Sequence, residues 1–313
     1  MTWWIVIGVL LLLWAAASVY VFCTACVRRK EDTRPLEQRV DPLWEPFKED
    51  VFEGVRWFQA QKPECVEITS HDGLRLRGNY LAHPNPRGTI LMFHGYRTDG
   101  HVDFCCAYRF YYELGFSILS VYQRSHAKSE GRFITFGVKE RFDCLGWTKY
   151  AAERFGADHP LILDGMSMGA STVLMASALP LPPSVKGIIA DSGFTSGWEE
   201  LLHLMRGMHI PCPRLLLGSA DLVTRCIAGF SFRECSTVEA MEKNTRPILM
   251  VHGGADNFVP ARFSEACFAA CRTDKELHII PGADHGTGYI VDLPRCQGAL
   301  KRFLTKCTEE THD

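Results

Sequence analysis

Residues 161–172 read LILDGMSMGAST, and the interpretation of the chain starts from this stretch. An apolar run, typical of a buried strand, leads into Ser167, which stands between Gly165 and Gly169. The small residues that follow are spaced as in a helix. A serine that joins a strand to a helix in the pattern G-x-S-x-G is typical of a nucleophile elbow, although a tight structural turn can contain the same five residues.

A nucleophilic serine needs a base, and the base needs an acid that orients it. In chains built around such an elbow, the acid and then the base follow the serine, each in a loop after a later strand. Asp256 follows the apolar run PILMVH, and His285 follows the run ELHII. We therefore predict Ser167 as nucleophile, Asp256 as acid and His285 as base, with Asp191 as the alternative acid.

The elbow also requires backbone N–H groups that stabilise a negatively charged oxygen. One donor should be Met168, the residue after the nucleophile, and the other should lie in the loop after the apolar strand TILMF. That loop reads His94-Gly95-Tyr96-Arg97. Gly95 lets the backbone approach a substrate, and the N–H of Tyr96 is the predicted donor. We assign His94 to shaping this loop rather than to acting as a base.

The rest of the sequence alternates between strand-like and helix-like patterns. Two strand-like runs flank His71-Asp72-Gly73, which is a hairpin signal. Six apolar runs follow, and helical patterns separate most of them. This order predicts an α/β fold with a mostly parallel, twisted sheet, an initial antiparallel hairpin and helices on both faces. Residues 192–246 interrupt the alternation, and we expect short helices near 197–208 and 218–229 to form a small cap above the carboxyl edge of the sheet.

The segment from Trp3 to Val27 contains no charged residue. As a helix it would be about 37 Å long, at about 1.5 Å per residue, which is enough to cross a bilayer. Its positive charges, at residues 28–30, follow the apolar run, whereas in a signal peptide they would precede it. By the positive-inside rule these charges place the rest of the chain in the cytoplasm. Cys23 and Cys26 lack a second ligand pair, so we do not expect zinc there.

Composition narrows the class of protein further. The 313 residues carry a net charge of −2 and no basic stripe, so we expect no nucleic-acid partner. The 13 cysteines are odd in number and form no repeating framework, which favours reduced thiols and hence a cytosolic environment. We therefore expect a single-pass protein of the cell membrane with its catalytic domain in the cytoplasm, and we expect it to need no metal and no organic cofactor.

The predicted organisation has four parts: a transmembrane helix at 1–27, a juxtamembrane linker and helix at 28–62, a domain at 63–307 with the insertion at 192–246, and a tail at 308–313. In the second part, apolar residues recur at helical spacing at Phe47, Val51, Val55 and Phe58. They predict a helix that lies either on the membrane surface or on the globular domain. We favour the domain, because the polar face is not strongly basic.

With these residues in place, the chain resembles the alpha/beta-hydrolases from roughly Pro63 to Cys307. The motifs LMFHGYR, YQRSHAKSEG, GMSMG, HGGADNFVP and PGADHG carry the resemblance. Within the superfamily the chain is similar to the branch of serine esterases, acylglycerol lipases and prolyl-aminopeptidase-like enzymes, including membrane-anchored bacterial members. One motif departs from the usual Asp-x-Arg-x-x-Gly-x-Ser: Tyr122 and Ala127 replace the Asp and the Gly, while Arg124 and Ser129 remain. The departure concerns a loop beside the active site and not the triad.

The resemblance and the predicted triad together imply a serine hydrolase that cleaves a carboxylic ester through an acyl-enzyme intermediate. The expected substrate is a small-molecule or lipid acyl compound. The apolar residues of the cap suit an acyl chain, and simple packing within the cap is the alternative explanation for them. Two alternatives stay open. A peptidase of the aminopeptidase-like branch would use acidic cap residues to hold a substrate amine, and four are available: Glu199, Glu200, Asp221 and Glu234. A non-catalytic scaffold or receptor with a hydrolase fold would not need all three triad residues.

Overall fold

The fold is built on an eight-stranded sheet, seen here in a computed structural model that describes residues 2–30, 34–38 and 42–309. The strand order is β1-β2-β4-β3-β5-β6-β7-β8. The hairpin of β1 (Glu64–Thr69) and β2 (Arg75–Leu81) is antiparallel, and β2 pairs antiparallel with β4 (Phe116–Val121). The other neighbouring strands pair in parallel, which confirms the predicted sheet. Parts of the predicted linker, at 31–33 and 39–41, and the tail from residue 310 lie outside the described residues.

The central strands are buried along almost their whole length, as their continuous apolar runs require. The strands not yet placed are β3 (Gly88–Phe93), β5 (Leu161–Met166), β6 (Val185–Asp191), β7 (Ile248–Gly253) and β8 (Lys275–Ile280). Every residue of β3, β5 and β7 is buried, whereas β8 at the sheet edge is mostly half-buried. The sheet is therefore covered on both faces in its centre.

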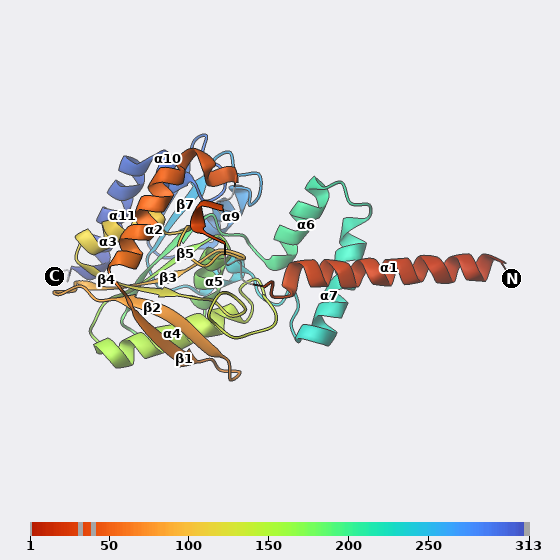
Figure 1. Ribbon diagram of the computed structural model, residues 1–313, viewed down its shortest axis with the longest axis horizontal. Coiled ribbons are helices and arrows are strands. Elements are labelled where there is room, and N and C mark those ends of the chain that lie inside the picture. Colours follow the sequence, from red (N-terminus) through yellow and green to blue (C-terminus); the bar gives the residue numbers. More distant parts are fainter. Residues whose placement is uncertain (1, 31–33, 39–41, 310–313) are drawn as a thin grey trace.

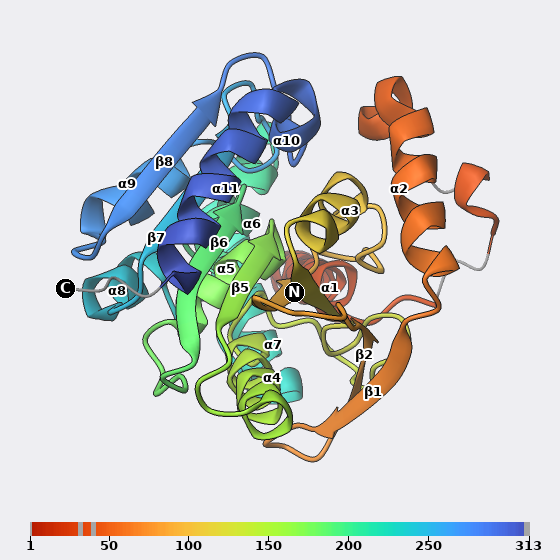
Figure 2. The same ribbon diagram turned by 90° about the vertical axis from the view of Figure 1, so that its left-hand side faces the viewer.

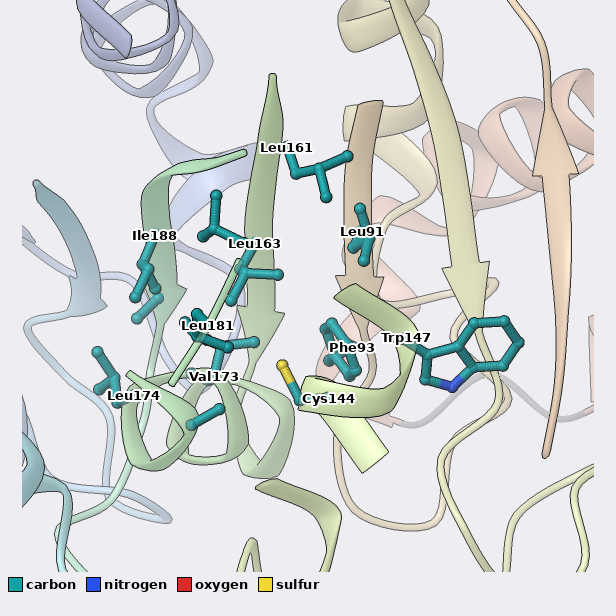
Figure 3. Close-up of a cluster of buried hydrophobic side chains, with 14 of the residues drawn as sticks. Leu91, Phe93, Cys144, Trp147, Leu161, Leu163, Val173, Leu174, Leu181 and Ile188 are labelled. Carbon is teal, nitrogen blue, oxygen red and sulfur yellow. The ribbon is translucent and has the colours of Figure 1, made fainter. Parts of the chain in front are cut away.

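One face of the sheet packs against four helices: α4 (Glu140–Phe155), α5 (Met168–Ala176), α8 (Thr237–Lys243) and α9 (Arg262–Ala270). Figure 3 shows side chains of this cluster, with Val173 of α5 and Trp147 of α4 on the same side of the sheet as Leu163 and Phe93. All four of these side chains are buried. The α8 helix was not predicted, because its seven residues are too few to show a clear helical period.

The opposite face packs against α3 (Cys105–Glu113), α11 (Leu293–Thr308) and α2 (Lys48–Ala60), with the short α10 (Gly288–Val291) beside α11. Two 3₁₀-helices, η1 (Leu36–Gln38) and η2 (Pro42–Phe47), precede α2. Figure 2 shows α2 alongside α3, and the ring of Phe58 stacks on that of Tyr108 with centroids 4.0 Å apart. Val51, Val55 and Phe58 are buried. Of the two predicted positions for this helix, the structure shows the one on the globular domain.

The segment between β6 and β7 lies away from the sheet and meets the N-terminal helix. It contains α6 (Gly197–Gly207) and α7 (Pro213–Ala228), and α1 (Thr2–Cys26) packs against α7 (Figure 1). Phe22 and Cys26 of α1 are buried in one cluster with side chains of α6 and α7. The first half of α1 projects beyond this contact and is exposed. The α7 helix begins before the predicted residue 218, because Pro213 suits the first turn of a helix.

Candidate active site

Ser167 lies on a sharp turn between β5 and α5. Its backbone has φ +56° and ψ −115°, which costs a non-glycine residue about 1–3 kcal/mol and is typical of functional sites. A Cβ added at Gly165 would overlap the carbonyl of Gly169, and a Cβ at Gly169 would overlap the carbonyl of Phe93. The Ser167 N–H donates to the carbonyl of Asp191 at 2.7 Å. Both glycines are thus needed for the strand and helix to approach, as the elbow pattern predicts.

The structure brings Ser167, His285 and Asp256 together. His285 Nε2 lies 2.9 Å from Ser167 Oγ, and His285 Nδ1 lies 2.7 Å from Asp256 Oδ2. Asp256 follows β7 and His285 follows β8, and neighbouring parallel strands end at the same edge of a sheet. Because a carboxylate can only accept, Nδ1 carries the proton and Nε2 is free to accept the serine proton.

Asp256 is fully buried and held in place by several donors. Its Oδ1 accepts from the N–H groups of Phe258 at 2.9 Å and Val259 at 2.7 Å. Burial alone would raise the pKa of Asp256, but hydrogen bonds from His252 and His285 outweigh it and lower the pKa to about 2. The group is therefore an ionised carboxylate in a fixed position, as the orienting role requires.

Asp191, the alternative acid, and Asp284, which directly precedes His285 in the chain, have other partners. The carboxyl of Asp191 accepts from Ser192 Oγ at 2.8 Å, and its carbonyl accepts from the backbone of Ser167. The carboxyl of Asp284 accepts from the backbone N–H of His285 at 2.7 Å. The imidazole of His285 itself is bonded to Asp256, so the geometry favours Asp256 over Asp191 as the acid.

The loop that follows β3 lies against Ser167. A Cβ added at Gly95 would be 3.4 Å from the Cβ of Ser167, and the Gly95 N–H donates to Asp103 at 2.6 Å. His94 is fully buried, with Nε2 accepting from the N–H of Gln123 at 3.0 Å and Nδ1 2.8 Å from the carbonyl of Gly95. Both ring nitrogens of His94 are thus engaged in holding the loop. Tyr96 follows at the wall of the cavity that contains Ser167.

Two side chains of this loop bind the carboxyl end of α1, which sequence analysis did not anticipate. The Tyr96 hydroxyl donates to the carbonyl of Ala25 at 2.7 Å, and Arg97 Nη2 donates to the carbonyl of Thr24 at 2.5 Å. The Arg97 N–H donates to Nε2 of His126 at 3.0 Å, and burial lowers the pKa of His126 to about 3, so the imidazole is a neutral acceptor. The last carbonyls of a helix need such donors.

The motif that departs from the family pattern contributes Arg124 to an ion cluster, in which Arg124 and Asp143 are buried and Asp72 is exposed. The Arg124 guanidinium makes two bonds to Asp143, both at 2.6 Å, and two to Asp72 at 2.9 and 3.0 Å. Ser129 Oγ donates to the carbonyl of Tyr122 at 2.6 Å. Ala127 adopts φ +40°, a value that glycine reaches more readily. The loop thus keeps a backbone conformation that suits glycine although the residue is alanine.

A cavity of about 470 Å³ contains Ser167, and its lining is mostly apolar. Glu200 of α6 also lines it; only 3% of this residue is exposed, and neither carboxyl oxygen has a hydrogen-bond partner among the residues that the structure describes. Burial raises the pKa of Glu200 to about 8. Among the four acidic cap residues, Glu199 is exposed, and Asp221 accepts from Ser231 and other donors outside the cavity. Sequence alone did not single out Glu200.

The chain is similar to proteins of known sequence and structure. Uncharacterized protein YqkD of Bacillus subtilis is 23% identical over 297 residues, covering 95% of this chain and 94% of that protein. The Pyrococcus furiosus esterase Pf2001 has a TM-score of 0.64 at 20% identity, over 80% of this chain and 94% of its own. Est1E of Butyrivibrio proteoclasticus, with ferulic acid bound, has a TM-score of 0.58 at 21% identity, over 77% of this chain and 98% of its own.

These structural likenesses show that the fold is that of an α/β-hydrolase, as the sequence motifs predict. The family match extends from residue 135, so it includes the serine elbow and the loops of Asp256 and His285. It supports a hydrolase of the serine type. Residues 135–311, more than half of the chain, match the prolyl oligopeptidase family, and the chain therefore belongs to that family.

Proposed function

We propose that the protein is a serine hydrolase that cleaves a carboxylic ester with a lipophilic acyl group. The observation that carries this proposal is the imidazole of His285, which lies within hydrogen-bond distance of both Ser167 Oγ and Asp256 beside an apolar cavity. The strained backbone of Ser167 supports the same role, because strain of this kind clusters at active sites.

The reaction follows from the positions of these groups. Ser167 Oγ attacks the ester carbonyl carbon while its proton passes to His285 Nε2, and the bond to the leaving alcohol then breaks as His285 returns that proton to the alcohol oxygen. A water molecule then attacks the acyl carbon while His285 takes its proton, and the bond to Ser167 Oγ breaks as His285 gives that proton to Oγ, which releases the carboxylic acid and the free serine. Asp256 keeps the imidazole oriented and stabilises its charge during both steps.

The negatively charged oxygen of the intermediate would be held by backbone N–H groups. We assign this role to Met168, which begins α5, and to Tyr96 in the loop against Ser167. The close approach of Gly95 to Ser167 supports this assignment. The start of α5 adds the positive end of a helix dipole at the same place.

The apolar lining of the cavity and the esterase names of the structural neighbours favour an ester substrate. A peptidase is the second candidate, favoured by the name of the matched family and by Glu200. A buried carboxyl without a partner would form an ion pair with a substrate amine. If the substrate is an ester, the carboxyl of Glu200, which is uncharged at neutral pH, would form a hydrogen bond with a neutral group of that substrate.

We further propose that α1 is a retained membrane anchor, as in the membrane-anchored esterases of the predicted branch. The helix from Trp3 to Cys26 is long and apolar enough to cross a bilayer. Phe22 and Cys26 are buried against the rest of the protein, so removal of α1 as a signal sequence would expose part of the core. The charges at residues 28–30 favour a cytoplasmic catalytic domain.

An active-site fluorophosphonate probe tests the catalytic proposal. We expect the folded full-length protein to be labelled and Ser167→Ala to abolish labelling. Ser177→Ala, which removes a buried hydroxyl that donates to the carbonyl of Leu174, should leave labelling unchanged. Absence of labelling on folded wild-type protein, or labelling that survives Ser167→Ala, would contradict the proposal and favour the scaffold alternative.

Glu200→Gln separates ester from peptide substrates. If the protein is an esterase, the variant should keep its turnover of p-nitrophenyl esters, and neither form should cleave amino-acid anilides. A peptidase would cleave anilides in wild-type form and lose most of that activity in Glu200→Gln, because the neutral amide can accept a hydrogen bond from an ammonium group but cannot form an ion pair with it. Glu199→Gln, at an exposed neighbouring position, is the matched control.

A further inference from the structure

The N-terminal helix forms one wall of the cavity that contains Ser167. The α1 residues that line the cavity are Ala17, Tyr20, Val21, Thr24 and Ala25, and their spacing of three and four places them on one helical face. Another wall is formed by Leu201, Leu204 and Met205 of α6 and by Met208, which directly follows that helix. The cavity therefore extends from the serine along α1 for about 12 Å, at about 1.5 Å per residue.

Exposed apolar side chains line this cavity and also occur on α7, the helix that packs against α1. Tyr20 on α1 and Met208 at the end of α6 line the cavity and are 70% and 65% exposed. On α7, Leu215 and Leu222 share a helical face and are 67% and 62% exposed. Soluble proteins rarely expose so many large apolar side chains together, and such patches mark interaction with a membrane or a partner.

The length of α1 determines how deep these residues lie if it spans a bilayer. A hydrocarbon core of about 30 Å requires about 20 helical residues, so a span that starts at Trp3 ends near Phe22. Trp14 and Ser18 lie inside that span, and both contact Ser219 of α7, at 3.0 and 2.7 Å. The contact places α7 at the membrane, and Figure 1 shows it lying across α1, as an interfacial amphipathic helix would lie.

We propose that the cavity opens between α1 and α6 into the bilayer, and that the substrate is a long-chain acyl ester resident in the membrane, which reaches Ser167 from the lipid phase. This inference rests on the proposed serine hydrolase and on α1 as its anchor. The acyl chain lies along the apolar face of α1 from Ala17 to Ala25, with its ester group at Ser167. The chain then passes from lipid to protein without exposure to water, which avoids the cost of hydrating it.

On this path α1 is part of the substrate-binding site and not only a membrane anchor, and the two roles predict different effects of substitutions in α1. An anchor alone would tolerate apolar substitutions equally on all of its faces. A wall of the cavity would tolerate them on the outer face, where Ala16 is exposed, and not on the inner face, where Ala17 lines the cavity. The two alanines are adjacent, but Ala17 is half-buried against the cluster of α6 and α7 side chains, whereas Ala16 is exposed. Ala16→Trp therefore controls for the added bulk on the helix, and a second, water-soluble substrate controls for a general loss of packing.

The test compares Ala17→Trp with Ala16→Trp in full-length protein reconstituted in phosphatidylcholine vesicles. Each is assayed on 1-oleoylglycerol in the same vesicles and on water-soluble p-nitrophenyl acetate. Because a pocket-filling group discriminates by about tenfold or more, we expect Ala17→Trp to lower oleate release by at least tenfold more than it lowers acetate turnover. Ala16→Trp should change neither.

Equal activity of the two variants on oleoylglycerol, or an equal loss on both substrates in Ala17→Trp, would overturn the inference. A second measurement uses detergent-solubilised p-nitrophenyl esters of increasing length, for which Ala17→Trp should shift the preference toward short chains. Fluorophosphonate labelling separates the two levels of the argument. If the wild type is labelled and Ala17→Trp does not change oleate release, only the membrane path is refuted. If the folded wild type is not labelled, the proposed hydrolase itself is refuted.

Discussion

The unpartnered carboxyl of Glu200 gives the sharpest physical prediction. This side chain is buried beside the Ser167 cavity, and burial raises its pKa to about 8 from the ordinary value of 4.5. The substitution Glu200→Gln keeps the shape of the side chain and removes its titratable carboxyl group. The amide has its own desolvation cost, but that cost does not change with pH. The pH dependence of the difference in stability therefore isolates the carboxyl.

The sign follows from the protons bound in each state. Below pH 4.5 the carboxyl is protonated in folded and unfolded chains and contributes no pH dependence. Between pH 4.5 and about 8 the unfolded chain is ionised while the folded protein keeps the proton, so the stability of the wild type falls as pH rises, by about 1.4 kcal/mol per unit. Between pH 5 and 7, the free energy of unfolding of Glu200→Gln should therefore gain about 2.5 kcal/mol relative to wild type.

Thermal unfolding of full-length protein in detergent at pH 5, 6 and 7 measures this effect. The difference in melting temperature between Glu200→Gln and wild type should grow by about 5 °C over this interval, at about 2 °C per kcal/mol for a domain of this size. Glu199→Gln, on the exposed side of the same helix, should follow the wild type at every pH. If the melting temperatures of Glu200→Gln and wild type change in parallel with pH, the carboxyl is ionised in the folded protein, and its pKa is not raised by burial.

Three further substitutions test the site and its surroundings. Asp256→Asn should lower the turnover of p-nitrophenyl acetate by about 10⁴, since the imidazole loses its orienting carboxylate; a loss below about tenfold would exclude Asp256 as the acid. Arg124→Leu should lower the free energy of unfolding by about 3–5 kcal/mol, because the buried carboxyl of Asp143 would lose its counter-charge, and urea titration measures this. Ala127→Gly should raise it by about 1 kcal/mol by relieving the positive φ; an unchanged urea midpoint would contradict that.

The sheet and the grouping of the candidate triad could be predicted because both follow from local patterns. Apolar runs of strand length mark β3 to β8, and a parallel sheet carries the loops after its strands to one edge. Asp256 and His285 each follow such a run, so their proximity to Ser167 could be predicted from the positions of the strands alone. Gly165 and Gly169 additionally indicated that the chain makes a sharp turn at Ser167, from a strand into a helix.

The rest depended on contacts between segments far apart in the chain. Nothing in the local pattern separates Glu199 from Glu200, yet one is exposed and the other is buried in the cavity. Likewise, an apolar segment near the N-terminus predicts a helix but not its neighbours. That Tyr96 and Arg97 bind carbonyls more than 70 residues earlier could be seen only in three dimensions.

The bonds from Tyr96 and Arg97 to the end of α1 have a consequence for how this chain can evolve and be processed. The exposed half of α1 can exchange one large aliphatic residue for another, but the half from Ala17 to Cys26 must change together with the loop and helices that it contacts. A chimera carrying a foreign membrane helix of equal hydropathy would lose acceptors for Tyr96 and Arg97. Proteolytic shedding of the helix would likewise release a fragment with an incomplete site. For this chain, membrane attachment and chemistry are inherited as one unit.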